Sequence, residues 1–327
     1  MKFARGIVLA VFFSVALAAV ESRAQGSAST EELAAERWFE RMQNSLQTMN
    51  FNATFVSADP FGMQMYRWLQ SVHGDSLSIE VLEQLEGAPQ PIIRVNNRLS
   101  YFSAAGPSYS TPGSRIVGPW PEGIHESIER LRESYEILLA GGVRMLDSPT
   151  IHLRLIPHQT DRFSYSVYVE RASGMLFGVK TYAPDGSLLS QVILSHFEHQ
   201  DQPIEELERS VEDVDFPAYA SPNGDIEQTS QWRVSELPRG FRLIREQRVN
   251  LRPMNTGADH MLFSDGMTQF SVYVNDDVQR PLPMRFQSLY SVVSLEQSNY
   301  SVTVVGKIPA TLAESVAQSV VRVSDND

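Results

Sequence analysis

Cysteine is absent from all 327 residues. Without it the chain cannot build a disulfide framework, and it cannot carry the acylated N-terminal cysteine of a lipoprotein. Its stability must therefore come from apolar cores. The roughly 300 residues that follow residue 24 are enough for one or two of them.

Long apolar runs are also missing, with one exception at the N-terminus. Lys2 and Arg5 precede an uncharged, mostly apolar run over residues 6–20, and small residues follow. Ala24 closes a small-x-small sequence, so residues 1–24 are expected to be a cleaved signal peptide of an exported protein. The alternative is a membrane anchor, which needs about 20 apolar residues to cross the bilayer, and this run is shorter.

Basic residues are scarce in the first part of the chain. The net charge is −12, and residues 25–230 hold 28 acidic residues against 14 basic ones. From residue 231 to the end the two kinds are balanced, with ten of each. An acidic surface argues against nucleic acid as a partner. The difference between the two parts predicts two units with different surfaces.

Motifs for catalysis are missing as well. The chain has no G-x-S-x-G nucleophile motif, no S-x-x-K, no H-E-x-x-H and no glycine-rich phosphate loop. His196 and His199 have a spacing that could contribute two metal ligands, but at the end of a predicted strand they point to opposite faces. Paired acids such as Glu205 and Glu206 are expected to be solvated. We therefore expect neither an enzyme nor a cofactor or metal site.

The apolar pattern predicts an α+β fold. A capping box at residues 29–32 opens a first helix, and residues 124–138 have the spacing of a second one. About nine or ten strands joined by short turns predict a large antiparallel sheet over residues 25–199. An acidic linker over 200–230 with a short helix near 204–211 leads to a smaller α+β domain over 231–323, which ends in a helix over 309–321. The strands are expected at residues 50–58, 61–72, 77–82, 91–95, 99–103, 143–146, 150–156, 163–171, 175–182 and 188–199, and then at 241–251, 260–264, 268–274, 290–295 and 301–305.

The predicted strand over residues 61–72 carries large apolar side chains on both parities. A sheet that is covered on one face alternates apolar and polar residues, so both faces of this strand are expected to be covered. A plain two-sided core would explain the pattern. An acyl-chain cavity inside a half-open sheet would also explain it, because methionine adapts to irregular shapes. The candidate lipid-binding residues are Phe55, Met63, Met65 and Trp68.

Five arginines fall between residues 239 and 252. Guanidinium groups in a row could bind carboxylates or phosphates of a partner. The alternative is a solvated edge strand that is protected by its charges. The candidate partner-binding residues are Arg242, Arg245 and Arg248.

Several segments, taken in order and together with the signal peptide, resemble one family over nearly all of the mature chain. These segments are ERLRESY at residues 129–135, RFSYSVYV at 162–169, LPRGF at 237–241, SDG at 264–266 and VVGKIP at 304–309. The set resembles the periplasmic regulators of the sigma-E envelope stress response, the RseB/MucB family.

The resemblance implies a large domain similar to the lipoprotein carriers LolA and LolB, an unclosed antiparallel β-barrel wrapped over helices, and a smaller C-terminal α+β domain. It implies a periplasmic negative regulator that binds the periplasmic region of a membrane-spanning anti-sigma factor and shields it from the site-1 protease. Release by lipopolysaccharide or another acylated ligand is also implied. A periplasmic lipoprotein or lipid carrier and an envelope hydrolase are the alternatives, and a homo-oligomer stays open.

Overall fold

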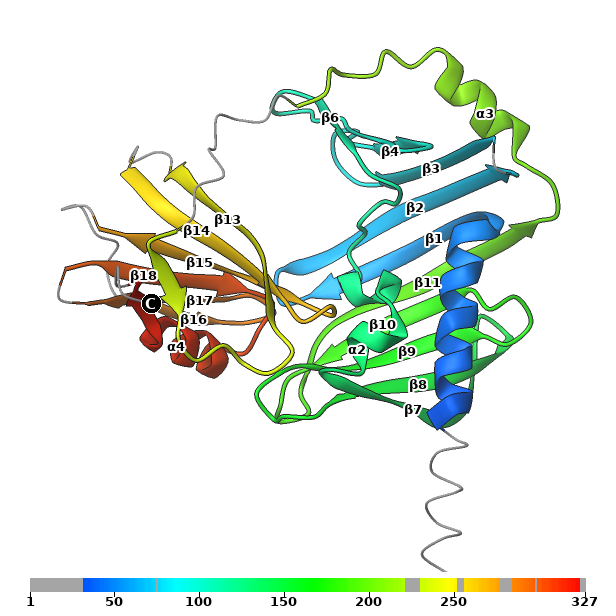
Figure 1. Cartoon of the computed structure of the whole chain (residues 1–327). Helices are drawn as coiled ribbons and strands as arrows, with labels where there is room; N and C mark the ends of the chain where they lie inside the picture. The colour runs from blue at the N-terminus through cyan, green and yellow to red at the C-terminus, as the bar shows by residue number, and fades with distance from the viewer. Residues whose placement is uncertain are drawn as a thin grey trace, which may run out of the picture.

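The computed structural model describes residues 32–74, 76–220, 230–251, 256–276, 284–297 and 299–323. The predicted signal peptide, residues 1–24, lies outside these ranges. Within them, one sheet of eleven strands and one of six form two domains, and a short pair of strands completes the second domain. Figure 1 shows the smaller domain beside the ends of the strands β1 (Asn50–Asp59) and β2 (Gly62–His73) of the larger one. In the described residues no helix is long and apolar enough to cross a membrane.

The first domain is a single antiparallel sheet with short connections. Its strands follow the order β6-β5-β4-β3-β2-β1-β11-β10-β9-β8-β7, and the two outermost strands, β6 and β7, are not paired with each other. The sheet is therefore an unclosed barrel, as expected. The bounds are β1 (Asn50–Asp59), β2 (Gly62–His73), β3 (Leu77–Gln84), β4 (Ile92–Val95), β5 (Arg98–Tyr101), β6 (Tyr109–Pro112), β7 (Tyr135–Met145), β8 (Ser148–Pro157), β9 (Ser164–Glu170), β10 (Leu176–Tyr182) and β11 (Leu188–Gln200).

The helix over residues 32–48 covers one face of this sheet, which we call the inner face (Figure 1). Phe39, Met42 and Leu46 recur at helical spacing and are buried in the main core. From the sheet, Phe51 and Trp68 meet them there. The amphipathic pattern of the sequence therefore predicted both this helix and its buried side.

The opposite, outer face is covered only in part by α3 (Glu205–Glu212). Leu207 and Val211 of α3 form a small separate core with Ile79 and Val81 of β3, and Leu69 of β2 packs against it. This explains why Leu69 is apolar although it lies on the opposite face of β2 from Trp68, which belongs to the main core. The short helix predicted near residues 204–211 is confirmed.

The predicted helix over residues 124–138 is wrong. The 3₁₀ helix η1 (Glu122–His125) and the single turn α2 (Ile128–Leu131) occupy its first part, and β7 begins at Tyr135. Tyr135 and Ile137 are buried on alternate positions, so the strand parity of the pattern prevails over its helical spacing. Gly141 lies inside β7 next to a bulge and has φ +118°. Strand β6 was not predicted from the sequence.

The second domain is a six-stranded antiparallel sheet with the order β13-β14-β15-β18-β17-β16. The predicted closing helix is confirmed as α4, whose Val316 packs into a core with Val302 and Val304. Strands β12 and β16 and the C-terminal β19 were not predicted. The bounds are β12 (Trp232–Val234), β13 (Arg242–Leu251), β14 (Thr256–Ser264), β15 (Gln269–Asn275), β16 (Met284–Gln287), β17 (Ser291–Glu296), β18 (Ser301–Gly306), α4 (Ala310–Gln318) and β19 (Val320–Arg322).

Candidate functional site

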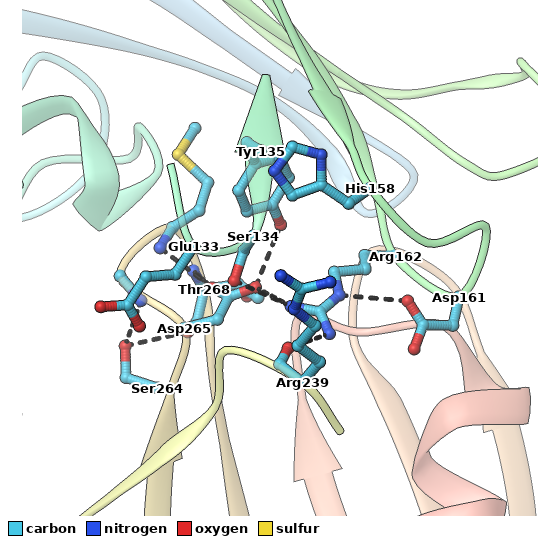
Figure 2. A network of polar contacts seen from close by, with 12 residues as sticks. Glu133, Ser134, Tyr135, His158, Asp161, Arg162, Arg239, Ser264, Asp265 and Thr268 are labelled. Carbon is cyan, nitrogen blue, oxygen red and sulfur yellow. Dashed lines mark hydrogen bonds and ion pairs between the residues drawn. The ribbon is translucent and has the colours of Figure 1, made fainter. Parts of the chain in front are cut away.

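The two domains meet at a buried ion pair. Arg162, just before β9, donates from Nη1 to Oδ2 of Asp265, in the turn between β14 and β15, over 2.9 Å. The Arg162 side chain is 2% exposed and that of Asp265 is 0% exposed. Tyr135 donates its hydroxyl to the same carboxylate oxygen at 3.2 Å, and Ser134 Oγ accepts from Arg162 at 3.1 Å (Figure 2). The pair thus joins the first domain to the second inside a polar network.

The turn that carries Asp265 is built by its own side chain. Oδ1 accepts the backbone N–H groups of Met267 at 3.0 Å and Thr268 at 2.9 Å, and Gly266 supplies a positive φ of +93°. Burial raises the pKa of Asp265, although these hydrogen bonds and the Arg162 guanidinium act in the opposite direction. Burial likewise raises the pKa of Tyr135 well above its usual range. Tyr135 therefore stays a hydroxyl donor to the carboxylate.

The other side of Arg162 contacts the start of the second domain. Its Nη2 donates to the backbone oxygen of Arg239 at 2.5 Å, and its Cζ lies 4.8 Å from the centroid of the Phe241 ring. Gly240, between these two residues, has φ +84°, and a Cβ atom there would lie 2.0 Å from Oγ of Ser134. Only glycine therefore allows the chain to pass this close to the first domain.

An apolar contact and a second polar layer complete the junction. Met267 is buried in the core of the first domain, although it belongs to the second. Closer to the surface, Arg242 pairs with Glu133, and Arg130 donates to the backbone oxygen of Ser264 at 2.8 Å. The β14–β15 turn is thus held from both domains, which fixes their relative placement.

A cavity of about 290 Å³ lies beside this network. Phe163 and Tyr165 line it from the first domain, and Tyr290 and Lys307 from the second. Glu122 also lines the cavity, and the partial loss of hydration there raises its pKa even though Lys307 acts in the opposite direction. A lining that mixes apolar and polar side chains, among them one carboxylate and one ammonium, suits an amphipathic group of a ligand. No cluster of three or more His, Cys, Asp or Glu side chains that could hold a metal occurs among the described residues.

The structure divides the four candidate lipid-binding residues between the two faces of the large sheet. Phe55 and Trp68 are buried on the inner face and pack against Trp120, with ring centroids 5.4 and 4.4 Å from it. Met63 and Met65 lie on the outer face of β2 and are 67% and 39% exposed. The four side chains are therefore not brought together into one site.

The candidate arginines are also divided. A bulge in β13 between Leu243 and Arg245 shifts the register, so that Arg242 and Arg245 lie opposite Ser264 and Leu262, whereas Arg248 lies opposite Asp259. Directly opposed residues share a face, so Arg248 is on the other face of the sheet. Arg248 pairs with Asp259 at 3.3 Å and with Asp276 at 3.7 Å.

The residues of the junction were not recognised from the sequence. The Asp265-Gly266 pair predicted a hairpin turn, and that turn is present. Nothing in the sequence shows that the turn carries the partner of a buried arginine 103 positions earlier. Because the two residues lie so far apart along the chain, no local sequence pattern identifies them as a buried ion pair.

The fold and the junction define a class: a two-domain α+β protein in which a small sheet domain is fixed against a large unclosed antiparallel sheet. Comparison with known sequences places the chain within this class. Residues 34–218 match the MucB/RseB N-terminal domain, and residues 226–321 match the MucB/RseB C-terminal domain. The chain belongs to the MucB/RseB family.

Individual relatives agree with this assignment. The chain is similar to the sigma-E factor regulatory protein RseB of Haemophilus influenzae, with 26% identity over 297 residues, 90% of this chain and 93% of the relative. It is also similar to the sigma factor AlgU regulatory protein MucB of Pseudomonas aeruginosa, with 25% identity over 305 residues, 89% of this chain and 92% of the relative. A solved structure of the Pseudomonas aeruginosa MucA/MucB complex has the same fold, with a TM-score of 0.71 at 23% identity, covering 89% of this chain and 99% of that one.

Proposed function

We propose that this protein is a periplasmic regulator that binds the periplasmic region of a membrane-spanning anti-sigma factor. The observation that carries the proposal is the match of both family domains, in order, over residues 34–321. Relatives that this chain matches over most of their length are named as sigma factor regulatory proteins. One structural relative was solved in complex with MucA. A fixed arrangement of two domains suits a protein that must hold an extended partner on a preformed surface.

Regulation would work by occlusion. The protein would bind a segment of the anti-sigma factor and deny it to the site-1 protease, which makes it a negative regulator. A releasing ligand must bind the free protein more tightly than the complex, because only a difference in affinity can shift the equilibrium. Lipopolysaccharide or another acylated envelope molecule is the proposed ligand of this kind.

Two surfaces are the proposed contacts. For the acyl ligand, the exposed Met63 and Met65 can touch a lipid directly, whereas Phe55 and Trp68 would do so only if the core opened. For the anti-sigma factor, Arg245 is the available member of the arginine row. It has no ion pair among the described residues, unlike Arg242 and Arg248.

The test is a proteolysis assay with the purified mature protein, the periplasmic domain of the anti-sigma factor and the site-1 protease. The mature protein is expected to slow cleavage in proportion to the fraction of substrate bound. An unrelated peptide substrate of the same protease serves as the control, because its cleavage should not change. Cleavage at the full rate with saturating protein would refute the proposal. Addition of lipopolysaccharide to the protected complex should restore cleavage, and continued protection would refute only the release step.

A further inference from the structure

The outer face of β8, β9 and β10 carries a regular array of cationic and aromatic side chains. The strand register aligns Arg154 with Ser166 and Lys180, and it aligns His152 with Tyr168 in the next row. Residues directly opposite one another in an antiparallel sheet point to the same face. Leu153 and Val167, on the other parity, are buried under the helix over residues 32–48, so the array lies on the outer face.

This part of the outer face is not covered by another element of the described chain. The helix over residues 32–48 lies on the inner face, and α3 packs over β2 and β3 at the far side of the sheet (Figure 1). His152, Tyr168 and Lys180 are half-buried among their neighbours, and Arg154 is exposed. We call His152, Arg154, Tyr168, Lys180 and Tyr182 the outer cationic face.

The side chains of this face support one another. The His152 ring stacks on that of Tyr168, with centroids 4.8 Å apart and planes 15° from parallel, and its Nε2 lies 2.9 Å from Oγ of Ser166. Lys180 Nζ lies 5.7 Å from the centroid of the Tyr168 ring. The tyrosine ring thus has both an imidazole and an ammonium as neighbours. The array is held in place while its donors remain available.

The two cations of this face are not neutralised by a carboxylate of the described chain. Arg154 and Lys180 form no ion pair with any described carboxylate, whereas the exposed Arg67 and Arg144 pair with Glu83 and Asp147. Glu136 lies on the same face and is exposed, but it is not within ion-pair distance of either cation. Burial lowers the pKa of His152, and Arg154 and Lys180 lower it further, which is consistent with a positive local potential.

We propose that the outer cationic face docks on the anionic phospholipid surface of a bilayer. This inference rests on the proposed function, because a membrane-spanning partner would place this protein beside such a surface. The donors are spread over three strands, which matches many phosphates in one plane, whereas an extended acidic peptide would follow one strand edge. Tyrosine together with arginine and lysine is the combination that membrane interfaces favour.

The expected strength of membrane binding is that of a weak contact, which would support binding to the anti-sigma factor. Each basic residue near an anionic leaflet contributes about fivefold in partitioning. The acidic residues elsewhere in the domain are screened beyond about 8 Å at physiological ionic strength, so they do not cancel the local attraction. Weak membrane contact would still matter, because the surface and the anti-sigma factor would be engaged together and each raises the local concentration for the other.

The experiment is co-sedimentation of the mature full-length protein with vesicles of phosphatidylglycerol and phosphatidylcholine in equal parts, and with vesicles of phosphatidylcholine alone. We expect binding to the anionic vesicles that falls as salt is raised. The double variant Arg154→Glu/Lys180→Glu should reduce partitioning at least about twentyfold. The control Arg37→Glu/Arg209→Glu makes the same change in net charge on exposed residues of the inner-face helix and of α3, and it should retain most of the binding.

Three outcomes would overturn the inference. One is equal binding to both kinds of vesicle, and another is equal loss in the double variant and its control. The third is a double variant that remains folded by circular dichroism but no longer binds the soluble anti-sigma domain, because the face would then be a protein contact. That binding is measured without vesicles. Failure of the wild-type protein to form the complex there would refute the proposed function, whatever the vesicles show.

Discussion

Arg162 and Asp265 form an ion pair between the two domains at 2.9 Å, and both side chains are almost completely removed from water. Two charges buried together add little net stability, because their attraction is offset by the loss of hydration. Removal of one partner is costly, since it leaves the other charge buried without compensation. The pair therefore acts mainly as a constraint: the domains can dock only where arginine and aspartate meet.

Asp265→Asn should destabilise the protein by about 3–5 kcal/mol. The amide can still accept the hydrogen bonds of the turn through its oxygen, so the change isolates the lost charge beside Arg162. Denaturant unfolding at neutral pH measures the effect. Asp147→Asn is the control, because the Arg144–Asp147 pair is exposed and should contribute less than about 1 kcal/mol. Equal stability of the two variants would show that Arg162 finds another partner or water.

Gly240→Ala should destabilise the junction by more than the same change at Gly186. Both glycines have φ +84°, so both variants carry the strain of a left-handed residue, about 1–2 kcal/mol. A Cβ at position 240 would also lie 2.0 Å from Ser134 Oγ, whereas nothing lies within 4 Å of one at position 186. The difference between the two unfolding free energies measures the close approach of the domains. Equal unfolding free energies of the two variants would mean that the domains shift at little cost to accommodate the added methyl group.

Much of the fold could be predicted because it depends on local patterns. Alternation of apolar residues located most strands of the large sheet, and Asp185-Gly186 marked a hairpin whose glycine has φ +84°. The pattern failed at residues 124–138, where Ile128 and Leu131 do lie on a helical turn but Tyr135 already belongs to β7. Helical and strand spacing coincide over so short a stretch.

The site depended on relationships that a linear sequence does not contain. The alternation of side chains along a regular strand predicts that Arg242 and Arg248 share one face of the sheet. The bulge in β13 instead places them on opposite faces. Phe55 and Met65 were grouped as one lipid site because both are large and apolar. The register instead places them on opposite faces of the sheet. Likewise, Asp265 looks like any turn aspartate until the fold brings Arg162 against it.

Stability should fall as the pH drops from neutral towards 4, in part because of His125. Burial and, to a smaller extent, the Arg115 guanidinium lower the pKa of His125 from 6.5 to about 4. The unfolded chain therefore binds more protons than the folded one between these values, and stability is lost as pH falls through them. Between pH 7 and pH 5 this amounts to about 2 kcal/mol.

The variant His125→Gln isolates this effect. Trp120 Nε1 donates to His125 Nε2 over 3.3 Å, and the glutamine oxygen can accept that hydrogen bond without titrating. Unfolding free energies of both proteins at the two pH values give the measurement. We expect the wild type to lose about 2 kcal/mol more than the variant. Equal losses of stability in the wild type and the variant would show that other groups cause the acid sensitivity.

Met65→Asp should weaken binding of an acyl ligand while leaving the fold intact. The side chain is 39% exposed, so the new carboxylate can stay hydrated in the free protein but would be desolvated against an acyl chain. Displacement of a fluorescent fatty acid from the mature protein measures affinity, and thermal unfolding checks the fold. Met284→Asp, at an exposed methionine of the second domain, is the control. Equal affinity in Met65→Asp and wild type would remove Met65 from the lipid site.

Arg245→Glu should weaken binding of the anti-sigma periplasmic domain by about fivefold or more, or ~1 kcal/mol. Its guanidinium has no ion pair among the described residues, so reversal of its charge acts on a partner rather than on the fold. Arg248→Glu is the contrasting variant, because it breaks contacts with Asp259 and Asp276 and should lower stability first. Titration calorimetry gives the affinity and denaturant unfolding gives the stability. Unchanged affinity in Arg245→Glu would show that the exposed arginine only protects the edge of the sheet from pairing with other chains.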